Sequence, residues 1–276
     1  MRTVYLGTSA FAAGVLERLA AGPHRPVLIV TRPDRPAGRG RRLTSPPVAE
    51  AARRLEIALS QPTDVNASDA RAQIAAADPE IVIVCAFGAI VRQPLLSEHE
   101  IVNVHPSLLP RWRGAAPIER AIMAGDERTG VSIMRLREGL DSGPVALKAE
   151  EPIGPDDTYG SLSVRLQALG ARLLARALDE RPPWVEQDEA GVTYAEKIAP
   201  DDRTLDPAAP APEQERVVRA LSPHIGARLR LADGSYLGIL RARVGDDGGL
   251  ELLEVQPPGG RPMAHADYVR GRDGRH

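Results

Sequence analysis

Residues 3–31 read TVYLGTSAFAAGVLERLAAGPHRPVLIVT and predict a strand, a helix and a second strand, in that order. The β-branched and apolar run at 3–7 is typical of a buried strand, and a second such run occupies 26–31. Between them, Ser9 is placed to cap a helix at its start, and Gly22 follows the end of that helix. Its apolar face is formed by Phe11, Val15, Leu16 and Leu19. The stretch is therefore typical of a βαβ unit.

The same alternation continues through the first two thirds of the chain. Further strands are expected at about 80–85, 101–104 and 130–136, and Pro46-Pro47 opens another helix. A long helix over about 157–180 has one leucine-rich face, formed by Leu162, Leu166, Leu169, Leu173 and Leu174. The fold class predicted is α/β, with a Rossmann-like, mostly parallel sheet and helices on both faces. The first turn lacks the G-x-G-x-x-G spacing, so we expect no nicotinamide cofactor.

Proline density predicts where the first domain ends. Prolines cluster at 181–183 and again at 206–212, and such segments continue neither a helix nor a central strand. We expect three parts, which are a large domain over 1–180, a linker over 181–206 and a small C-terminal domain over 207–276. In the small domain, a helix at about 213–221 precedes alternating runs that are separated by Asp-Gly pairs. This pattern predicts hairpins of a small β-barrel.

Composition and charge limit the function classes. The chain has 35 Lys and Arg against 37 Asp and Glu, a net charge of −2, so any contact with nucleic acid is local. Its 2 Phe, 2 Trp and 5 Tyr argue against binding by base stacking. The strongest basic cluster holds a single acid, Asp34, among Arg32, Arg35, Arg39, Arg41 and Arg42. Cys85 is the only cysteine, and no apolar run is long enough to span a membrane, so we expect a reducing cytoplasmic location.

The polar residues best suited to chemistry stand where the strand at 101–104 ends. Asn103 and His105 are two residues apart, so both project to the same face of a strand. An amide donor and an imidazole side by side can polarise one oxygen atom. Asp141 lies in an Asp-Ser-Gly turn, where it either caps its own backbone or orients the imidazole and relays a proton. From the residues alone, the structural and the catalytic interpretations both stay open.

Two motifs resemble those of a known family. They are Asn103-x-His105-x-Ser107-Leu-Leu-Pro110 and, about thirty residues later, Leu140-Asp141-x-Gly143. Both resemble the folate-dependent formyltransferases, which use 10-formyltetrahydrofolate. Three more segments resemble the methionyl-tRNA formyltransferases among them, namely TRPDRPAGRG at 31–40, RWRGAAP at 111–117 and TYAEK at 193–197. The resemblance runs in order from residue 3 to about 200 and fades beyond, where SPHIGA at 222–227 replaces an aromatic-containing segment of many family members.

The resemblance implies a role for each matched residue. Asn103 and His105 would donate to the oxyanion that forms on the formyl group, and Asp141 would orient His105 and assist proton movement. The residues matching the tetrahydrofolate-binding stretch are Ser107, Leu108, Leu109 and Pro110. The main candidate for contact with the acceptor end of tRNA is Arg39, and the further candidates are Arg35, Arg41 and Arg42. No metal is implied.

The activity implied is formyl transfer from 10-formyltetrahydrofolate to the α-amino group of methionyl-initiator-tRNA, for bacterial translation initiation, by a protein that we expect to be a monomer. Two alternatives stay open. The same core would formylate an amino sugar or another small amine, and turnover would then be indifferent to salt. A tRNA-binding module without catalysis is the other alternative, and the presence of all three catalytic residue types argues against it.

Overall fold

The computed structural model describes residues 1–37 and 42–273, which form two compact units. The first unit consists of Met1–Ala115, Gly130–Glu151 and Val164–Tyr194. The second consists of Ala116–Thr129, Pro152–Ser163 and the described part of Ala195–His276. The domain boundaries expected near residues 180 and 206 stay predictions.

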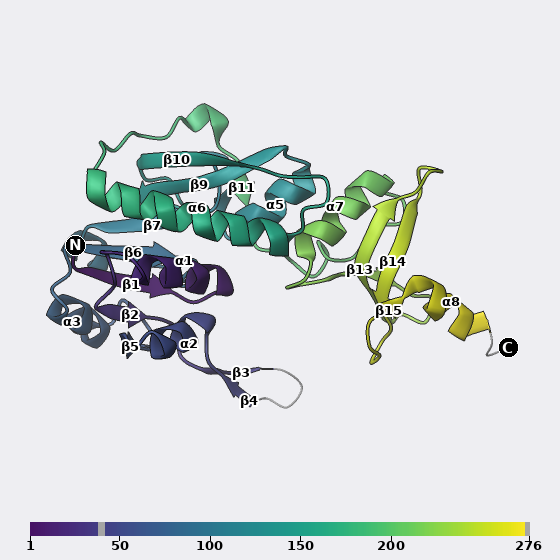
Figure 1. Cartoon of the computed structure of the whole chain (residues 1–276), viewed down its shortest axis with the longest axis horizontal. Coiled ribbons are helices and arrows are strands. Elements are labelled where there is room, and N and C mark those ends of the chain that lie inside the picture. Colours follow the sequence, from purple (N-terminus) through teal and green to yellow (C-terminus); the bar gives the residue numbers. More distant parts are fainter. Residues whose placement is uncertain (38–41, 274–276) are drawn as a thin grey trace. The chain divides into compact units, whose positions relative to one another are not determined.

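A seven-stranded sheet, counted over the described residues, forms the centre of the first unit (Figure 1). Its strands are β1 (Thr3–Gly7), β2 (Leu28–Val30), β5 (Ala58–Ser60), β6 (Ile81–Cys85), β7 (Ile101–His105), β9 (Arg128–Arg135) and β10 (Val145–Pro152). They lie in the order β10-β9-β7-β6-β1-β2-β5. Strand β1 pairs in parallel with β2 and β6, as do β2 with β5 and β6 with β7, whereas β7 and β9 are antiparallel. The predicted mostly parallel sheet is confirmed.

The parallel register aligns the carboxyl ends of the central strands. Gly7 of β1 is opposite Cys85 of β6, and Val84 of β6 is opposite Asn103 of β7. Open α/β sheets bind ligands at this edge. His105, the last residue of β7, therefore stands where a ligand site is expected.

Helices α1 (Ala10–Ala20) and α6 (Tyr159–Glu180) lie across one face of the sheet (Figure 1). The predicted cap is confirmed, because the Ser9 side chain accepts a hydrogen bond from the Ala12 amide. The two helices meet at Gly14, where a Cβ atom would stand 2.0 Å from Oε1 of Gln167. A side chain at this position would displace the end of the Gln167 side chain from the contact between the two helices. The first unit also contains α2 (Pro47–Arg54), α3 (Ser68–Ala76) and α4 (Leu95–Glu98).

The core of the first unit is aliphatic, as the composition predicts. Val4, Leu6, Ile74 and Val82 are fully buried in one cluster around the sheet. Cys85 is also fully buried, and burial raises the pKa of its thiol to about 12. This high pKa makes the thiol a poor nucleophile.

The basic insertion after β2 contains a short hairpin that the sequence did not predict. Strands β3 (Arg35–Ala37) and β4 (Arg42–Thr44) pair antiparallel around residues 38–41, which lie outside the described residues. Each strand has three residues and no apolar alternation, so the sequence offered no periodic signal.

Another short two-stranded sheet pairs β8 (Arg113–Gly114) with β11 (Tyr194–Ala195), and a 3-10 helix spans Glu189–Gly191.

The second unit is built on an antiparallel sheet in the order β12-β13-β14-β15. Its strands are β12 (Ala227–Arg230), β13 (Tyr236–Val244), β14 (Leu250–Gln256) and β15 (Met263–Ala264), and its helices are α5 (Pro117–Ala124), α7 (Ala211–Leu221) and α8 (His265–Asp273). The hairpins and the helix expected there are confirmed, whereas α8 was not predicted because its sequence has no apolar periodicity. Across the described residues, no helix has the length and apolar character needed to cross a membrane.

Candidate active site

Three polar side chains from two parts of the first unit meet at the carboxyl end of β7. Nδ2 of Asn103 is 3.4 Å from Oδ1 of Asp141, and Nδ1 of His105 is 3.6 Å from Oδ2 of the same carboxylate. Asp141 comes from the loop between β9 and β10, 38 residues away from Asn103. Asn103 is 8% exposed and His105 is 3% exposed. The structure therefore brings together the three residues that the sequence singled out.

The imidazole of His105 is held at both nitrogen atoms. Its Nε2 atom is 2.9 Å from the backbone oxygen of Trp112. A carbonyl oxygen only accepts hydrogen bonds, so Nε2 carries a proton and donates a hydrogen bond to the Trp112 oxygen. The other nitrogen, Nδ1, then faces Asp141, and a proton on it would lie directly opposite the carboxylate. The imidazole and the carboxylate therefore face each other at close range.

The carboxylate of Asp141 is held by the backbone as well as by side chains. The amide of Gly114 donates a hydrogen bond to Oδ2 at 2.9 Å. The backbone of Asp141 has φ +45°, in the left-handed region that is uncommon for residues other than glycine. Two residues later, a Cβ atom on Gly143 would stand 1.9 Å from the carbonyl oxygen of Arg135. The turn is thus closely fitted to β9, and the carboxylate has a defined position.

Gln187 supports this turn from outside, a contact that the sequence analysis missed. Its Nε2 atom donates to the backbone oxygens of Asp141 at 2.8 Å and of Gly143 at 2.7 Å. Its Oε1 atom accepts from Nε of Arg113 at 3.0 Å. Residue type and spacing carry no signal for Gln187, because it lies 46 residues beyond Asp141. Arg113 and Gly114 belong to the segment at 111–117 that the family resemblance had already singled out.

The stretch predicted to contact folate is largely engaged within the protein. The hydroxyl of Ser107, which is fully buried, donates to the oxygen of Arg111 at 2.6 Å. Leu109 is 1% exposed and packs with Met134 and Val145. Leu108 and Pro110 are half-buried and offer apolar surface. Of the four predicted residues, the structure leaves these two accessible to a ligand.

Further apolar surface flanks the three polar residues. Leu140, which precedes Asp141, is 59% exposed, and Ile90, in the loop after β6, is 68% exposed. Ala86 and Gly88 of the same loop have positive φ, which turns the chain away from the end of β6. Ligand sites combine apolar walls with a few polar groups, and this edge of the sheet has both.

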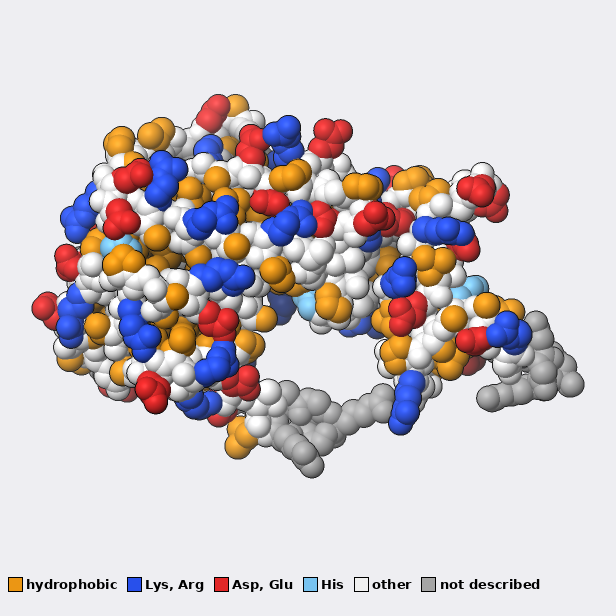
Figure 2. Space-filling view, viewed as in Figure 1, with side chains coloured by type: hydrophobic (Ala, Val, Ile, Leu, Met, Phe, Trp, Pro, Cys, Tyr) orange, Lys and Arg blue, Asp and Glu red, His pale blue; other side chains and the backbone are white. Residues whose placement is uncertain are grey.

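The basic insertion is anchored at its base by Asp34. Its carboxylate accepts hydrogen bonds from Gln61 at 2.7 Å and from Ser45 at 2.9 Å, and these bonds lower the pKa of Asp34. Arg35 is exposed on β3, and Arg42 begins β4. Arg39 and Arg41 lie outside the described residues. On the face drawn in Figure 2, the first unit carries interspersed basic and acidic side chains, and the net charge of the whole chain is only −2.

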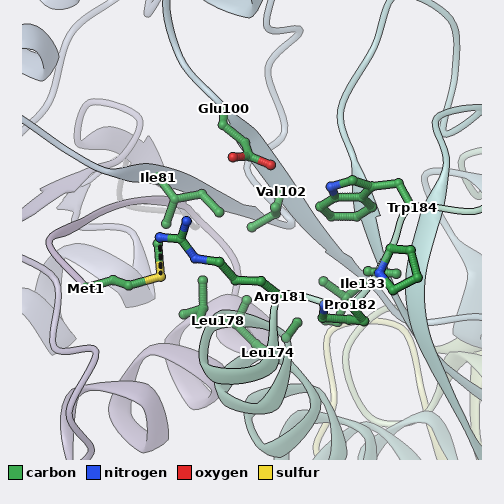
Figure 3. A pocket seen from close by; sticks show the side chains of 13 residues that line it. Met1, Ile81, Glu100, Val102, Ile133, Leu174, Leu178, Arg181, Pro182 and Trp184 are labelled. Carbon is green, nitrogen blue, oxygen red and sulfur yellow. Dashed lines mark hydrogen bonds between the residues drawn. The ribbon is translucent and has the colours of Figure 1, made fainter.

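A cavity of about 300 Å³ lies in another part of the first unit (Figure 3). Its walls include Ile81 of β6, Val102 of β7, Leu174 and Leu178 of α6, and Trp184. Ile81 and Val102 stand near the amino ends of their strands, opposite the edge that His105 occupies. Neither Asn103, His105 nor Asp141 lines this cavity, so we do not assign the reaction to it.

Known proteins similar in sequence match this chain over nearly its whole length. A family model described as formyl transferase matches residues 1–178. A methionyl-tRNA formyltransferase of Halorhodospira halophila is 44% identical over 301 residues, which cover 98% of this chain and 96% of the relative. A protein of the same name from Dinoroseobacter shibae is 45% identical over 292 residues, with 98% and 97% covered.

Solved structures share the fold at lower identity. Methionyl-tRNA formyltransferase from Clostridium thermocellum matches with a TM-score of 0.69 and 14% identity over 96% of this chain and 99% of that one. HypX from Aquifex aeolicus, in complex with tetrahydrofolic acid, matches with a TM-score of 0.67 and 17% identity over 98% of this chain and 47% of its own. A sugar N-formyltransferase from a Shewanella species gives 0.64 and 18%, with 86% and 95% covered. These likenesses establish the fold.

Proposed function

The chain belongs to the formyl transferase family, and we propose that it transfers the formyl group of 10-formyltetrahydrofolate to the α-amino group of methionyl-initiator-tRNA. The observation that carries the proposal is the convergence of Asn103 and His105 on the carboxylate of Asp141 at the carboxyl end of β7. The relatives that match nearly the full chain at 44% and 45% identity are named for this activity. We place the enzyme in the cytoplasm, in bacterial translation initiation.

The reaction forms one carbon–nitrogen bond, breaks another and moves one proton. The neutral α-amine attacks the formyl carbon, and the carbonyl oxygen becomes an oxyanion. The bond between that carbon and N10 of the folate then breaks, and the proton lost by the amine ends on N10. The protein must stabilise the oxyanion and move the proton, and no covalent intermediate with the protein is required.

Asn103 is the donor best placed for the oxyanion. Its amide has two N–H groups, and the contact with Asp141 is long, at 3.4 Å. A second N–H is therefore available to the formyl oxygen, and such a donor contributes roughly 10²- to 10³-fold in turnover. His105 donates to the same oxygen when its Nε2 proton leaves the carbonyl of Trp112, because catalytic hydrogen bonds often form only in the substrate complex.

Asp141 and His105 assist the transfer of the proton from the attacking amine to N10. The carboxylate faces Nδ1 of the imidazole, so it stabilises the positive charge that appears when the ring accepts a second proton. The Gly114 amide fixes the carboxylate in this position. General acid–base catalysis of this kind contributes roughly 10²- to 10⁴-fold.

The folate donor fits the apolar surface around these residues. Leu108 and Pro110 are half-buried, and Leu140 and Ile90 are exposed, so a flat ring system has apolar surface to bind. A structural neighbour was solved with tetrahydrofolic acid bound. The backbone oxygen of Leu109 already accepts from Lys148 at 3.0 Å. A carbonyl oxygen has two lone pairs, so this bond leaves one acceptor position at Leu109 for the polar edge of the ligand.

The basic insertion is our candidate for the tRNA contact. Arginine pairs with phosphate through two hydrogen bonds, and the glycines at 38 and 40 permit close approach to an RNA backbone. Arg39 is the main candidate, with Arg35, Arg41 and Arg42 beside it. Replacing Arg39 by Ala should flatten the dependence of log affinity on log salt by about 0.7 to 0.9 per lost phosphate contact. An unchanged slope would remove Arg39 from the interface.

One assay separates the proposed activity from the alternatives. The purified chain is incubated with 10-formyltetrahydrofolate and charged initiator tRNA, and in parallel with a panel of amino sugars and other small amines. We expect formyl-methionyl-tRNA and no reaction with the panel. Consumption of a small amine without formylation of the tRNA would favour the sugar-type activity, which one structural neighbour has by name. Binding of tRNA without any turnover would leave a binding module.

A further inference from the structure

We propose that Gln187 is a positioning residue of the catalytic site, which holds the backbone of the Asp141 turn and is itself oriented by Arg113. The inference rests on the proposed function in one respect, namely that the carboxylate of Asp141 takes part in the reaction. Gln187 touches neither the imidazole nor the carboxylate in the described contacts, so its effect is exerted through the main chain of the turn.

Both the NH₂ group and the oxygen of the Gln187 amide have hydrogen-bonding partners. Both contacts of Nε2 are to carbonyl oxygens, those of Asp141 and Gly143, on either side of Ser142. Oε1 accepts from Nε of Arg113, a group that can only donate. The opposite orientation of the amide would place its oxygen against two acceptors and its nitrogen against a donor. The orientation is therefore determined by its partners.

The turn requires such a restraint because its backbone is unfavourable by itself. Asp141 has φ +45°, and Gly139, two residues earlier, has φ +100°. A residue other than glycine in the left-handed region is strained and persists only where the surroundings impose it. Leu140, which lies between these two, is 59% exposed and gives the turn little packing. Gln187 restrains the turn through its hydrogen bonds to the carbonyl oxygens of Asp141 and Gly143.

Arg113 connects this restraint to the rest of the site. It is 3% exposed, and its terminal nitrogens contact Glu189, the closer at 2.9 Å. The backbone oxygen of the preceding residue, Trp112, accepts a hydrogen bond from His105, and the amide of the following residue, Gly114, donates one to Asp141. Three consecutive residues thus hold the imidazole, the Gln187 amide and the carboxylate. We therefore expect a shift in one of these contacts to affect the others.

The competing explanation is that Gln187 only attaches the segment around it to the first unit. A purely structural contact would change stability and leave the balance of kinetic constants as it is. A positioning residue would lower kcat with little effect on KM, because the carboxylate would be misplaced in the transition state while substrate binding stays. The two explanations therefore differ in a measurable way.

The test variant is Gln187→Met, which keeps the length of the side chain and removes its three hydrogen bonds. We expect kcat to fall about 10- to 100-fold, with KM for both substrates within threefold of the wild-type values. Gln187→Glu is the second variant, because a carboxylate keeps the contact with Arg113 and loses the donors to the two carbonyls. The matched control is Glu186→Gln, which alters a neighbouring exposed side chain paired with Arg137.

A double-mutant cycle with Asp141→Asn tests whether Gln187 acts through the carboxylate. If it does, Gln187→Met lowers turnover less than threefold in the Asp141→Asn background, since the misplaced group is already inactive. Equal fold-losses in both backgrounds would overturn the proposal. An unchanged kcat in the single variant, with an active wild type, would overturn it too.

Hydrogen exchange supplies a readout that is independent of turnover. The Gly114 amide donates to Asp141, so its exchange should accelerate at least about fivefold in Gln187→Met and stay unchanged in Glu186→Gln. Unchanged exchange in both variants would refute the restraint. If the wild-type chain fails to formylate any amine, the proposed function fails, while the exchange experiment still decides whether Gln187 holds the turn.

Discussion

Replacing Asp141 by Asn tests the catalytic centre most directly, because it removes a charge and preserves shape. One oxygen faces Nδ2 of Asn103 at 3.4 Å, and the other faces the Gly114 amide at 2.9 Å and Nδ1 of His105 at 3.6 Å. An amide has only one oxygen, so its NH₂ group must oppose a donor at one of these two places. The NH₂ group should therefore face Asn103, because that contact, at 3.4 Å, is weaker than the one with the Gly114 amide, at 2.9 Å.

The magnitude follows from these contacts. The imidazole loses the negative charge that stabilises its protonated form, and Asn103 is pushed from its position. We expect turnover to fall roughly 10²- to 10⁴-fold, the range for general acid–base catalysis, which corresponds to about 2.7–5.4 kcal/mol of transition-state stabilisation. Opposing buried donors cost about 1–3 kcal/mol, at roughly 2–4 °C in Tm for each kcal/mol, so the protein stays folded.

The assay is formyl transfer from 10-formyltetrahydrofolate to charged initiator tRNA, with both substrates saturating and the melting temperature recorded in parallel. Asp179→Asn is the matched control, because Asp179 accepts from Nε2 of His24 at 2.8 Å in a second His–Asp pair of the same unit. The reasoning is refuted if Asp141→Asn retains a third or more of wild-type turnover. It is refuted equally if Asp179→Asn loses as much activity.

Three further predictions concern stability and reactivity. Gly143→Ala places a Cβ atom 1.9 Å from the carbonyl oxygen of Arg135, so thermal unfolding should show a loss of about 1–3 kcal/mol or more. Gly271→Ala, with open space around it in α8, should be neutral or slightly stabilising. An undiminished stability of Gly143→Ala would show that the turn can relax. Burial raises the pKa of Cys85 to about 12, so iodoacetamide at pH 8 should label it only after unfolding in urea; rapid labelling of the native protein would contradict this. Hydrogen bonds from Gln61 and Ser45 lower the pKa of Asp34, so this carboxylate stabilises the fold fully above its unfolded pKa of about 3.9 and loses that effect as pH falls through its lower folded pKa. The Tm difference between wild type and Asp34→Asn should therefore be constant above about pH 5 and shrink below pH 4, whereas a difference that persists at pH 2 would exclude this carboxylate as its origin.

Local signals carried most of the secondary structure. The strand at 3–7, the cap at Ser9 and the long helix near 157–180 are confirmed within one or two residues, because strand and helix periods are properties of neighbouring residues. The hairpin of β3 and β4 and the final helix α8 escaped prediction, since neither has an apolar face. Short elements of this kind form through contacts that no local pattern records.

The candidate site, too, was predicted from local sequence only in part. The two-residue spacing of Asn103 and His105 placed both on one face of β7, and this required nothing beyond strand geometry. The position of Asp141 beside them depends on a contact across 38 residues, and the sequence left it open. The family resemblance selected this residue, and the fold supplied the distances.

What the sequence by itself determined is the α/β class and the residue types available for chemistry, because aliphatic periodicity and strand-end polarity are encoded in adjacent positions. Tertiary structure alone decided how these groups are held. The proton of His105 points at a backbone carbonyl, and the Asp141 turn is held by the Gln187 side chain and a glycine amide. Main-chain donors and acceptors are the same for nearly every residue type, so their use in a site becomes visible only when distant segments pack together.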